Sequence, residues 1–283
     1  MSFHRKPITF VNHVNIKVQN LERSLEYYQE VIGFKILEQT KNKAKLTADG
    51  NTCILSIEQP DNVIPKQGRT TGLYHFALLV PRRSDLADIV HHFIAKGIRI
   101  GSSDHLVSEA LYLNDPDGNG IEIYVDRDPS VWEWRNGEIA MTVDPLDFAD
   151  LLKTGDSEKA WEGLPAGTVM GHIHLHVSHL NEAEEFYTKG LGFDVVNRFG
   201  DQALFISAGN YHHHIGLNTW QGVGAPESPA NSVGLESFTI LLPDEAYRKN
   251  MVASLESIGA SVTEENGVVT TKDPSGNRIH LAV

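Results

Sequence analysis

Three side chains that can carry acid–base or metal chemistry lie within one short stretch of the sequence, residues 103–122. They are His105, Tyr112 and Glu122. The turn sequence Asp-Pro-Asp-Gly at 115–118 separates Glu122 from the other two. A Pro early and a Gly late in such a segment are typical of a tight reversal of the chain. We therefore expect two short strands, joined by this turn, to carry the three side chains.

Glu122 is flanked by apolar residues in the second of these strands, Ile-Glu-Ile-Tyr-Val. Because strand side chains alternate between faces, Ile121 and Ile123 point one way. Glu122 points the other way, together with Tyr124. An ionised carboxylate in such surroundings costs several kcal/mol unless it meets a cation. The pattern therefore indicates a metal ion bound by Glu122.

The composition is that of a globular protein long enough for about two ordinary domains. The chain has 283 residues, of which 41% are apolar and 22% are charged. Its net charge of −13 argues against a nucleic-acid or anionic-membrane partner, because both are bound by basic surface. The single Cys53 excludes an internal disulfide and fits a reducing compartment. With no signal peptide and no apolar run of about 18 residues, the expected location is the cytoplasm.

One small unit occurs four times along the chain. Residues 10–34 read as a strand, a helix with apolar residues at helical spacing and a glycine stop, and residues 169–193 repeat this order. Weaker copies begin at Leu73 and Leu235. Each copy finishes with three more short strands, so the predicted unit is a βαβββ module. Residues 127–167, rich in Asp, Trp, Pro and Gly, read as a connection between two halves.

This unit resembles the module of the vicinal oxygen chelate superfamily, which includes glyoxalases, bleomycin-resistance proteins and extradiol dioxygenases. The resemblance implies an α+β fold in which four βαβββ modules pair into two cup-shaped, barrel-like mixed sheets with the helices outside. We expect residues 1–126 to hold an N-terminal pair of modules and residues 168–283 a C-terminal pair, with 127–167 as the linker.

The stretch around Glu122 resembles the signature of the type I extradiol catechol 2,3-dioxygenases. That signature runs from a His, through an aliphatic-Tyr pair and a Pro-x-Gly turn, to a ligand Glu. The positions that fit it are His105, Leu111, Tyr112, Asp115, Pro116, Gly118 and Glu122. Ser103, at the usual first position, departs from it. By this resemblance Tyr112 donates a hydrogen bond to a substrate oxygen, and His105 supports Tyr112 or takes part in proton transfer.

In this superfamily the metal ligands sit at the start of a module's first strand and at the end of its last strand. In the four modules in turn, the first-strand position falls on His13, His75, His172 and Ser237. The last-strand position falls on Glu122 in the second module and His280 in the fourth. Two His and one carboxylate suit non-haem Fe(II) and oxygen chemistry. By resemblance we expect His75, Glu122 and His172 to bind Fe(II), with Mn(II) as the alternative metal and His13 as the alternative to His172.

A run of histidines favours the third module as the partner of the second. Extradiol dioxygenases carry a His-His pair just before the last strand of the module that donates the first ligand, and its second His is the acid–base group. By that resemblance the pair is His213 and His214, with His214 as the acid–base residue. The corresponding segment of the first module, residues 52–58, has no His.

The implied function is Fe(II)-dependent extradiol cleavage of catechol or a substituted catechol, giving a muconic semialdehyde. The partners would be a small aromatic diol and dioxygen, with no nucleic acid and no membrane, and homo-oligomerisation stays open. One alternative is a glyoxalase-type isomerase or lyase, which typically uses four protein ligands. Another is a non-catalytic binding protein of the bleomycin-resistance type, without a metal. The sequence leaves open the roles of His174, His176, His213 and His280.

Overall fold

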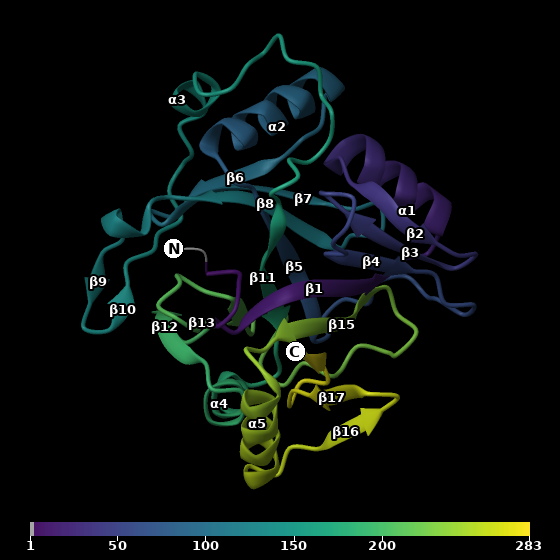
Figure 1. Ribbon diagram of the computed structural model, residues 1–283, viewed down its shortest axis with the longest axis vertical. Helices are drawn as coiled ribbons and strands as arrows, with labels where there is room; N and C mark the ends of the chain where they lie inside the picture. Colours follow the sequence, from purple (N-terminus) through teal and green to yellow (C-terminus); the bar gives the residue numbers. More distant parts are fainter. Residues whose placement is uncertain (1–2) are drawn as a thin grey trace.

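Four units with the order strand, helix and three strands follow one another along the chain (Figure 1). The computed structural model describes residues 3–283. The first unit consists of β1 (Phe10–Lys17), α1 (Leu21–Tyr27), β2 (Lys35–Gln39), β3 (Lys43–Thr47) and β4 (Leu55–Glu58). The second consists of β5 (Gly72–Leu79), α2 (Arg83–Lys96), β6 (Gly101–Asp104), β7 (Ser108–Asn114) and β8 (Gly120–Asp126). The third consists of β11 (Val169–His176), α4 (Leu180–Glu185), β12 (Asp194–Phe199), β13 (Ala203–Ser207) and β14 (Ile215–Asn218). The fourth consists of β15 (Gly234–Leu241), α5 (Glu245–Ser257), β16 (Val262–Glu265), β17 (Val268–Lys272) and β18 (Arg278–Ala282).

The first unit shows how local sequence sets these elements. The Asn20 side chain caps α1 by accepting a hydrogen bond from the N–H of Arg23, which satisfies one of the free amides of the first turn. A π-helical turn at Tyr28–Ile32 follows, and Gly33 ends it with a φ of 94°, a backbone conformation that favours glycine. The predicted glycine stop is therefore confirmed.

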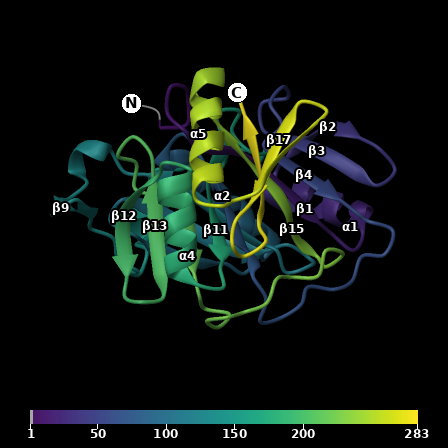
Figure 2. The same ribbon diagram turned by 90° about the horizontal axis from the view of Figure 1, so that it is seen from below.

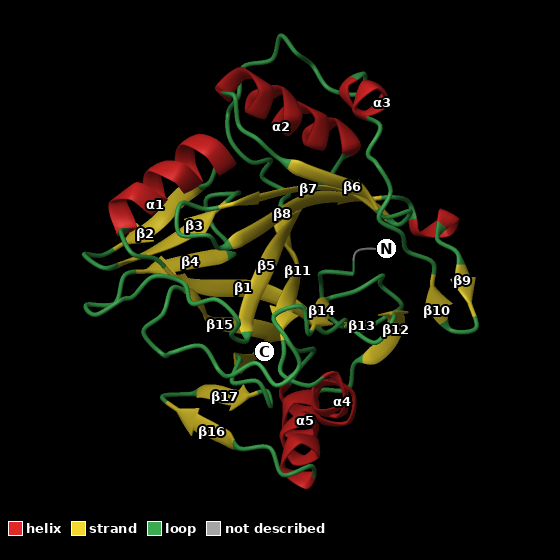
Figure 3. Ribbon diagram, turned by 180° about the vertical axis from the view of Figure 1, so that it is seen from behind, coloured by secondary structure: helices red, strands yellow, loops and turns green. Residues whose placement is uncertain are grey.

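The strands form two eight-stranded mixed sheets. One has the order β16-β17-β18-β15-β1-β4-β3-β2 and joins the first and fourth units. The other has the order β12-β13-β14-β11-β5-β8-β7-β6 and joins the second and third units. Figure 3 shows α1 and α2 on the outer side of the strands. The α+β class is the one expected from the sequence, and each sheet takes one unit from residues 1–126 and one from residues 168–283.

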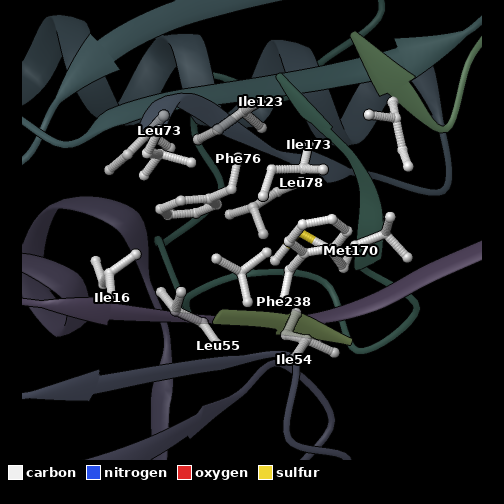
Figure 4. Close-up of a cluster of buried hydrophobic side chains, with 14 of the residues drawn as sticks. Ile16, Ile54, Leu55, Leu73, Phe76, Leu78, Ile123, Met170, Ile173 and Phe238 are labelled. Atoms are coloured by element: carbon white, nitrogen blue, oxygen red, sulfur yellow. The ribbon is translucent and has the colours of Figure 1, made fainter. Parts of the chain in front are cut away.

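The buried core lies between the two sheets. Phe76, Leu78 and Ile173 from one sheet belong to the same apolar cluster as Ile16 and Phe238 from the other (Figure 4). Figure 2, the view from below, shows α4 and α5 side by side in front of the strands. Because side chains alternate along a strand, residues on the opposite face of each strand are left free of this core. Those opposite faces line the two cups.

Two irregularities in the pairing of β5 with β11 set which side chains face the cup. The register shifts once between Leu73 and His75 and once between Met170 and His172, so Tyr74 and Gly171 are extra residues in their strands. A bulge of this kind bends the strand and re-aims the side chains next to it. Here both bulges lie directly beside a histidine expected to bind metal.

The connection between the halves contains β9 (Trp134–Arg135), β10 (Glu138–Ile139) and α3 (Phe148–Leu152). Asp144 pairs with Asp104 at the edge of β6, which lays the preceding residues 141–143 along the cup. Trp132 packs against Tyr211, and Trp161 stacks on His92 with ring centroids 4.2 Å apart. In residues 3–283 no helix is long and apolar enough to cross a membrane.

Candidate metal centre

Three buried side chains from three neighbouring strands converge in the cup of the second and third units. His75 is on β5, Glu122 on β8 and His172 on β11. The Nε2 atoms of His75 and His172 lie 3.0 and 3.2 Å from Oε2 of Glu122. Ala77 pairs with Glu122 on one side and with His172 on the other, and its small side chain lets the two longer ones meet.

The donor set fits a divalent metal ion. One nitrogen or oxygen from each of His75, Glu122 and His172 lies within 4.8 Å of the others, the only such group in the part of the chain that the structure describes. Nε2 of His75 is buried and, although it lies 3.0 Å from Oε2 of Glu122, it forms no hydrogen bond with any of those residues. Two imidazoles and one carboxylate on one side of an ion leave other positions open, which suits Fe(II).

The pKa shifts match the protonation states that metal ligands need. Burial lowers the pKa of His172 to about 4, despite the attraction of Glu122, so this imidazole is neutral at neutral pH. Burial by itself would raise the pKa of Glu122, but attraction to His172 and His75, together with the hydrogen bond to His172, holds it well below its usual range. The carboxyl group is therefore ionised and the imidazole neutral.

Tyr112 and His105 form a hydrogen-bonded pair beside the three candidate ligands. Nδ1 of His105 lies 2.6 Å from the carbonyl oxygen of Thr142, so this nitrogen carries the proton and donates it. Nε2 is then an acceptor, and it lies 2.6 Å from the Tyr112 hydroxyl, which donates to it. Burial and the nearby Glu122 raise the pKa of Tyr112 well above its usual range, so the phenol stays protonated.

The structure does not bring His214 into the cup, which corrects the sequence prediction for this residue. Nδ1 of His214 accepts a hydrogen bond from the N–H of Ala208 at 3.2 Å. Nε2 then donates to the carbonyl oxygen of Phe3, also at 3.2 Å, so both ring nitrogens are occupied. The neighbouring His213 lines the cup instead, with its ring centroid 4.1 Å from that of His172.

A chain of hydrogen bonds through His212 and Asp126 orients the ring of His213, and the sequence analysis did not predict this role for either residue. Nδ1 of His213 lies 2.8 Å from Nδ1 of His212, and Nε2 of His212 lies 2.7 Å from Oδ1 of Asp126. Asp126 also accepts a hydrogen bond from the hydroxyl of Tyr211 at 3.1 Å. Asp126 could have been found from the sequence, because it lies four residues after Glu122 on the same strand and therefore on the same face.

A cavity of about 350 Å³ opens next to the candidate ligands. Its inner end is lined by polar groups of His75, Tyr112, Glu122 and His213. Its outer part is mostly apolar, and no Lys or Arg is among the described residues that line it. The apolar lining consists of Tyr74, Val107, Met141, Val143, Phe199, Phe205 and Trp220. The volume and lining suit a small, uncharged molecule with polar atoms at one end.

Comparison with known proteins identifies the family. Residues 10–123 and 169–281 match the Glyoxalase/Bleomycin resistance protein/Dioxygenase superfamily. The chain belongs to this superfamily. It is 46% identical over 270 residues to the catechol-2,3-dioxygenase of Bacillus subtilis (strain 168), which covers 94% of each chain. The crystal structure of glyoxalase I from Zea mays shares the fold, with a TM-score of 0.60 at 16% identity over 96% of this chain and 92% of that one.

A second relative within the superfamily matches part of the chain. Biphenyl-2,3-diol 1,2-dioxygenase 3 of Rhodococcus globerulus is 27% identical over 166 residues, which cover 53% of this chain and 87% of that one. The superfamily resemblance drawn from the sequence is thus confirmed.

The cup formed by the first and fourth units has the superfamily frame without the ligand group. His13 lies on β1 of that sheet, and its Nε2 is 2.8 Å from Oγ of Ser56. Nδ1 of His280 is 2.9 Å from Oγ1 of Thr270. His13 and His280 therefore stand apart from His75 and Glu122, on the other sheet, and each has a hydroxyl partner of its own.

Proposed function

We propose that this protein is an extradiol dioxygenase that cleaves the ring of catechol or a substituted catechol beside its two hydroxyl groups. His75, Glu122 and His172 would hold Fe(II), with Mn(II) as the alternative, and the product would be a muconic semialdehyde. The observation that carries the proposal is the ligand group at the inner end of a cavity that also contains Tyr112 and His213. The 46% identity to the Bacillus subtilis catechol-2,3-dioxygenase supports it.

A bound Fe(II) ion would supply the redox chemistry, holding the diol and dioxygen side by side and passing electron density from the ring to oxygen. The Tyr112 hydroxyl already donates its proton to Nε2 of His105, so it would orient the diol by accepting a hydrogen bond from one of its hydroxyl groups. The apolar outer lining keeps water away from the ring once a substrate fills the cavity. The Thr142 carbonyl fixes the tautomer of His105, and His105 in turn holds the Tyr112 hydroxyl by a hydrogen bond. Tyr112 is therefore already in position and need not move when the diol binds.

His213 is placed to accept a proton from a diol hydroxyl. The Asp126 carboxylate accepts from Nε2–H of His212, and in the tautomer with its proton on Nε2 the Nδ1 atom of His212 is an acceptor. Nδ1–H of His213 then donates to it, which leaves Nε2 of His213 free as a base. Burial, with His172 and His212 nearby, lowers the pKa of His213 well below its usual range. The imidazole is therefore neutral at neutral pH, the form in which Nε2 can accept a proton.

The two alternative functions fit the described residues less well. A glyoxalase-type isomerase would call for four protein ligands, whereas the group contains three, with a single carboxylate. A metal-free binding cup would gain nothing from an ionised Glu122 buried beside His75, whose Nε2 has no hydrogen-bond partner among the described residues. An unsatisfied buried group of this kind is costly unless a ligand completes it.

The test is anaerobic reconstitution with Fe(II), followed by catechol and then air, with oxygen uptake and yellow product measured together. We expect one dioxygen consumed for each product formed. His172→Ala should abolish turnover, and His13→Ala, the matched change in the other cup, should leave it nearly unchanged. Bound metal without oxygen uptake on any simple catechol would refute the dioxygenase and favour an isomerase.

A further inference from the structure

His174 has a buried ring nitrogen that no described protein group satisfies. It lies on β11, two residues after His172 on the same face, and is 3% exposed. Its Nε2 has no hydrogen-bond partner among residues 3–283. His176, two residues further along the same strand, differs, because its Nδ1 lies 2.7 Å from Oδ1 of Asn218. The structure thus separates two histidines that look equivalent in the sequence.

The ring of His174 lies at the inner end of the substrate cavity. It lines the cavity, and its centroid is 5.1 Å from that of His75, its cross-strand partner. Tyr112 contacts the same His75 ring, at 5.8 Å. His174 also lies near three other aromatic rings, Tyr74 at 5.0 Å, Trp220 at 5.3 Å and Phe205 at 5.6 Å. The polar neighbourhood of His174 is therefore the metal end of the cavity.

A glycine on the next strand makes room for this ring. Gly216 on β14 pairs directly with His174, and a Cβ atom there would come within 2.8 Å of Cγ of His174. Real Cβ atoms essentially never come so close to another atom, so any larger residue would displace the imidazole. Gly216 has no positive φ that would otherwise call for glycine. The glycine at position 216 is thus needed for the His174 ring to occupy its observed position.

We propose that His174 is a substrate-contacting residue, whose Nε2 forms a hydrogen bond with a hydroxyl oxygen of the bound aromatic diol. The inference rests on the proposed function, because it takes the diol as the molecule that fills the cavity. A diol held at the metal end presents its two oxygens between Tyr112 and His174. The unsatisfied nitrogen then gains its partner only when substrate is bound, and so contributes to affinity for diols.

The test compares His174→Phe with His176→Phe in the Fe(II)-loaded protein under anaerobic conditions. Binding of 4-nitrocatechol is followed by its visible spectrum, and the metal content of each variant is measured separately. We expect His174→Phe to weaken 4-nitrocatechol binding about tenfold, the upper end of the usual effect of losing a hydrogen bond between neutral groups, with metal content unchanged. His176→Phe should bind like the parent protein. Gly216→Ala should weaken binding in the same direction, because it moves the ring.

Each other outcome has a definite meaning. Unchanged 4-nitrocatechol affinity in His174→Phe would overturn the inference, since the nitrogen would then face water alone. Loss of metal in His174→Phe would also overturn it and make His174 a ligand. Parent protein that binds 4-nitrocatechol yet never consumes oxygen with catechol would refute the proposed dioxygenase and leave the contact with diols standing.

Discussion

At the scale of single residues, the acid–base role proposed for His213 depends on the carboxylate of Asp126. An asparagine at this position can turn its NH₂ group toward His212 and reverse the direction of both hydrogen bonds. Nε2 of His213 would then carry a proton and could no longer act as a base. We expect Asp126→Asn to lower kcat roughly 100-fold or more, the range attributed to general base catalysis, with little change in KM.

Steady-state oxygen uptake on catechol checks this expectation. Tyr211→Phe is the matched control, because it removes the other hydrogen bond to Asp126 and keeps the carboxylate beside His212. It should retain most of the parent kcat. Equal loss of kcat in both variants would mean that Asp126 matters for packing and not for the tautomer of His213.

The candidate ligands were easier to predict from the sequence than the acid–base residue. His75 and Glu122 follow from strand alternation together with the resemblance to extradiol dioxygenases, and both lie in the group that the structure assembles. His213 and His214 could not be separated, because they belong to a run of three histidines outside a regular strand, where alternation gives no rule. Contacts with Phe3, distant in the sequence, turn His214 out of the cup.

At the scale of strands and helices, the bulge at Tyr74 depends on a glycine in the neighbouring strand. Gly120 on β8 pairs with His75, and a methyl group at Gly120 would overlap the carbonyl oxygen of Tyr74 and press on Cβ of His75. We expect Gly120→Ala to displace the bulge and weaken metal binding roughly tenfold, as for other changes that misalign a ligand. Overpacking of this kind should also cost about 1–3 kcal/mol of stability.

Metal titration and urea unfolding of Gly120→Ala measure the two effects. Gly68→Ala is the control, because a methyl group there meets no atom within 4 Å and the backbone φ is not positive. It should leave metal affinity and stability close to those of the parent. Normal metal affinity in Gly120→Ala would show that His75 is positioned by other contacts.

The element order was largely predictable from the sequence, and the bulges were not. Helix caps such as Asn20 and stops such as Gly33 are local signals that the structure confirms. The bulges at Tyr74 and Gly171 arise where β5 and β11, about 100 residues apart in the sequence, meet across the sheet centre. Their positions depend on long-range packing, for which a single sequence carries no local pattern.

At the scale of the whole molecule, two cups with the same frame differ in chemistry. In both, a histidine is the fourth residue in the first strand of one unit, His172 in one cup and His13 in the other. The first cup adds His75 and Glu122, and its imidazoles surround a cavity. The second places a hydroxyl group next to His13. Its histidines, His13 and His280, are partly buried, and burial lowers the pKa of each, which has a consequence for the stability of the fold in acid.

Buried neutral histidines make the folded state sensitive to mild acid. Burial, with Lys43 nearby, lowers the pKa of His13 to about 4, and burial lowers the pKa of His176 to about 4 despite its hydrogen bond to Asn218. In the unfolded chain such groups titrate near pH 6.5. Between pH 6.5 and 4 the unfolded state therefore binds more protons, and the free energy of unfolding falls as the pH falls. Each histidine contributes on the order of 1–3 kcal/mol to this loss.

Urea unfolding of the metal-free protein at pH 7.5, 6.5 and 5.5 should show a midpoint that drops steeply below pH 6.5. EDTA in every sample separates this effect from loss of metal as the ligands protonate. His13→Gln should make the drop shallower, because one buried group can no longer bind a proton, whereas His179→Gln, at an exposed position, should not. A midpoint that stays constant from pH 7.5 to 5.5 would contradict this prediction. It would mean that these histidines have similar pKa values in the folded and the unfolded protein.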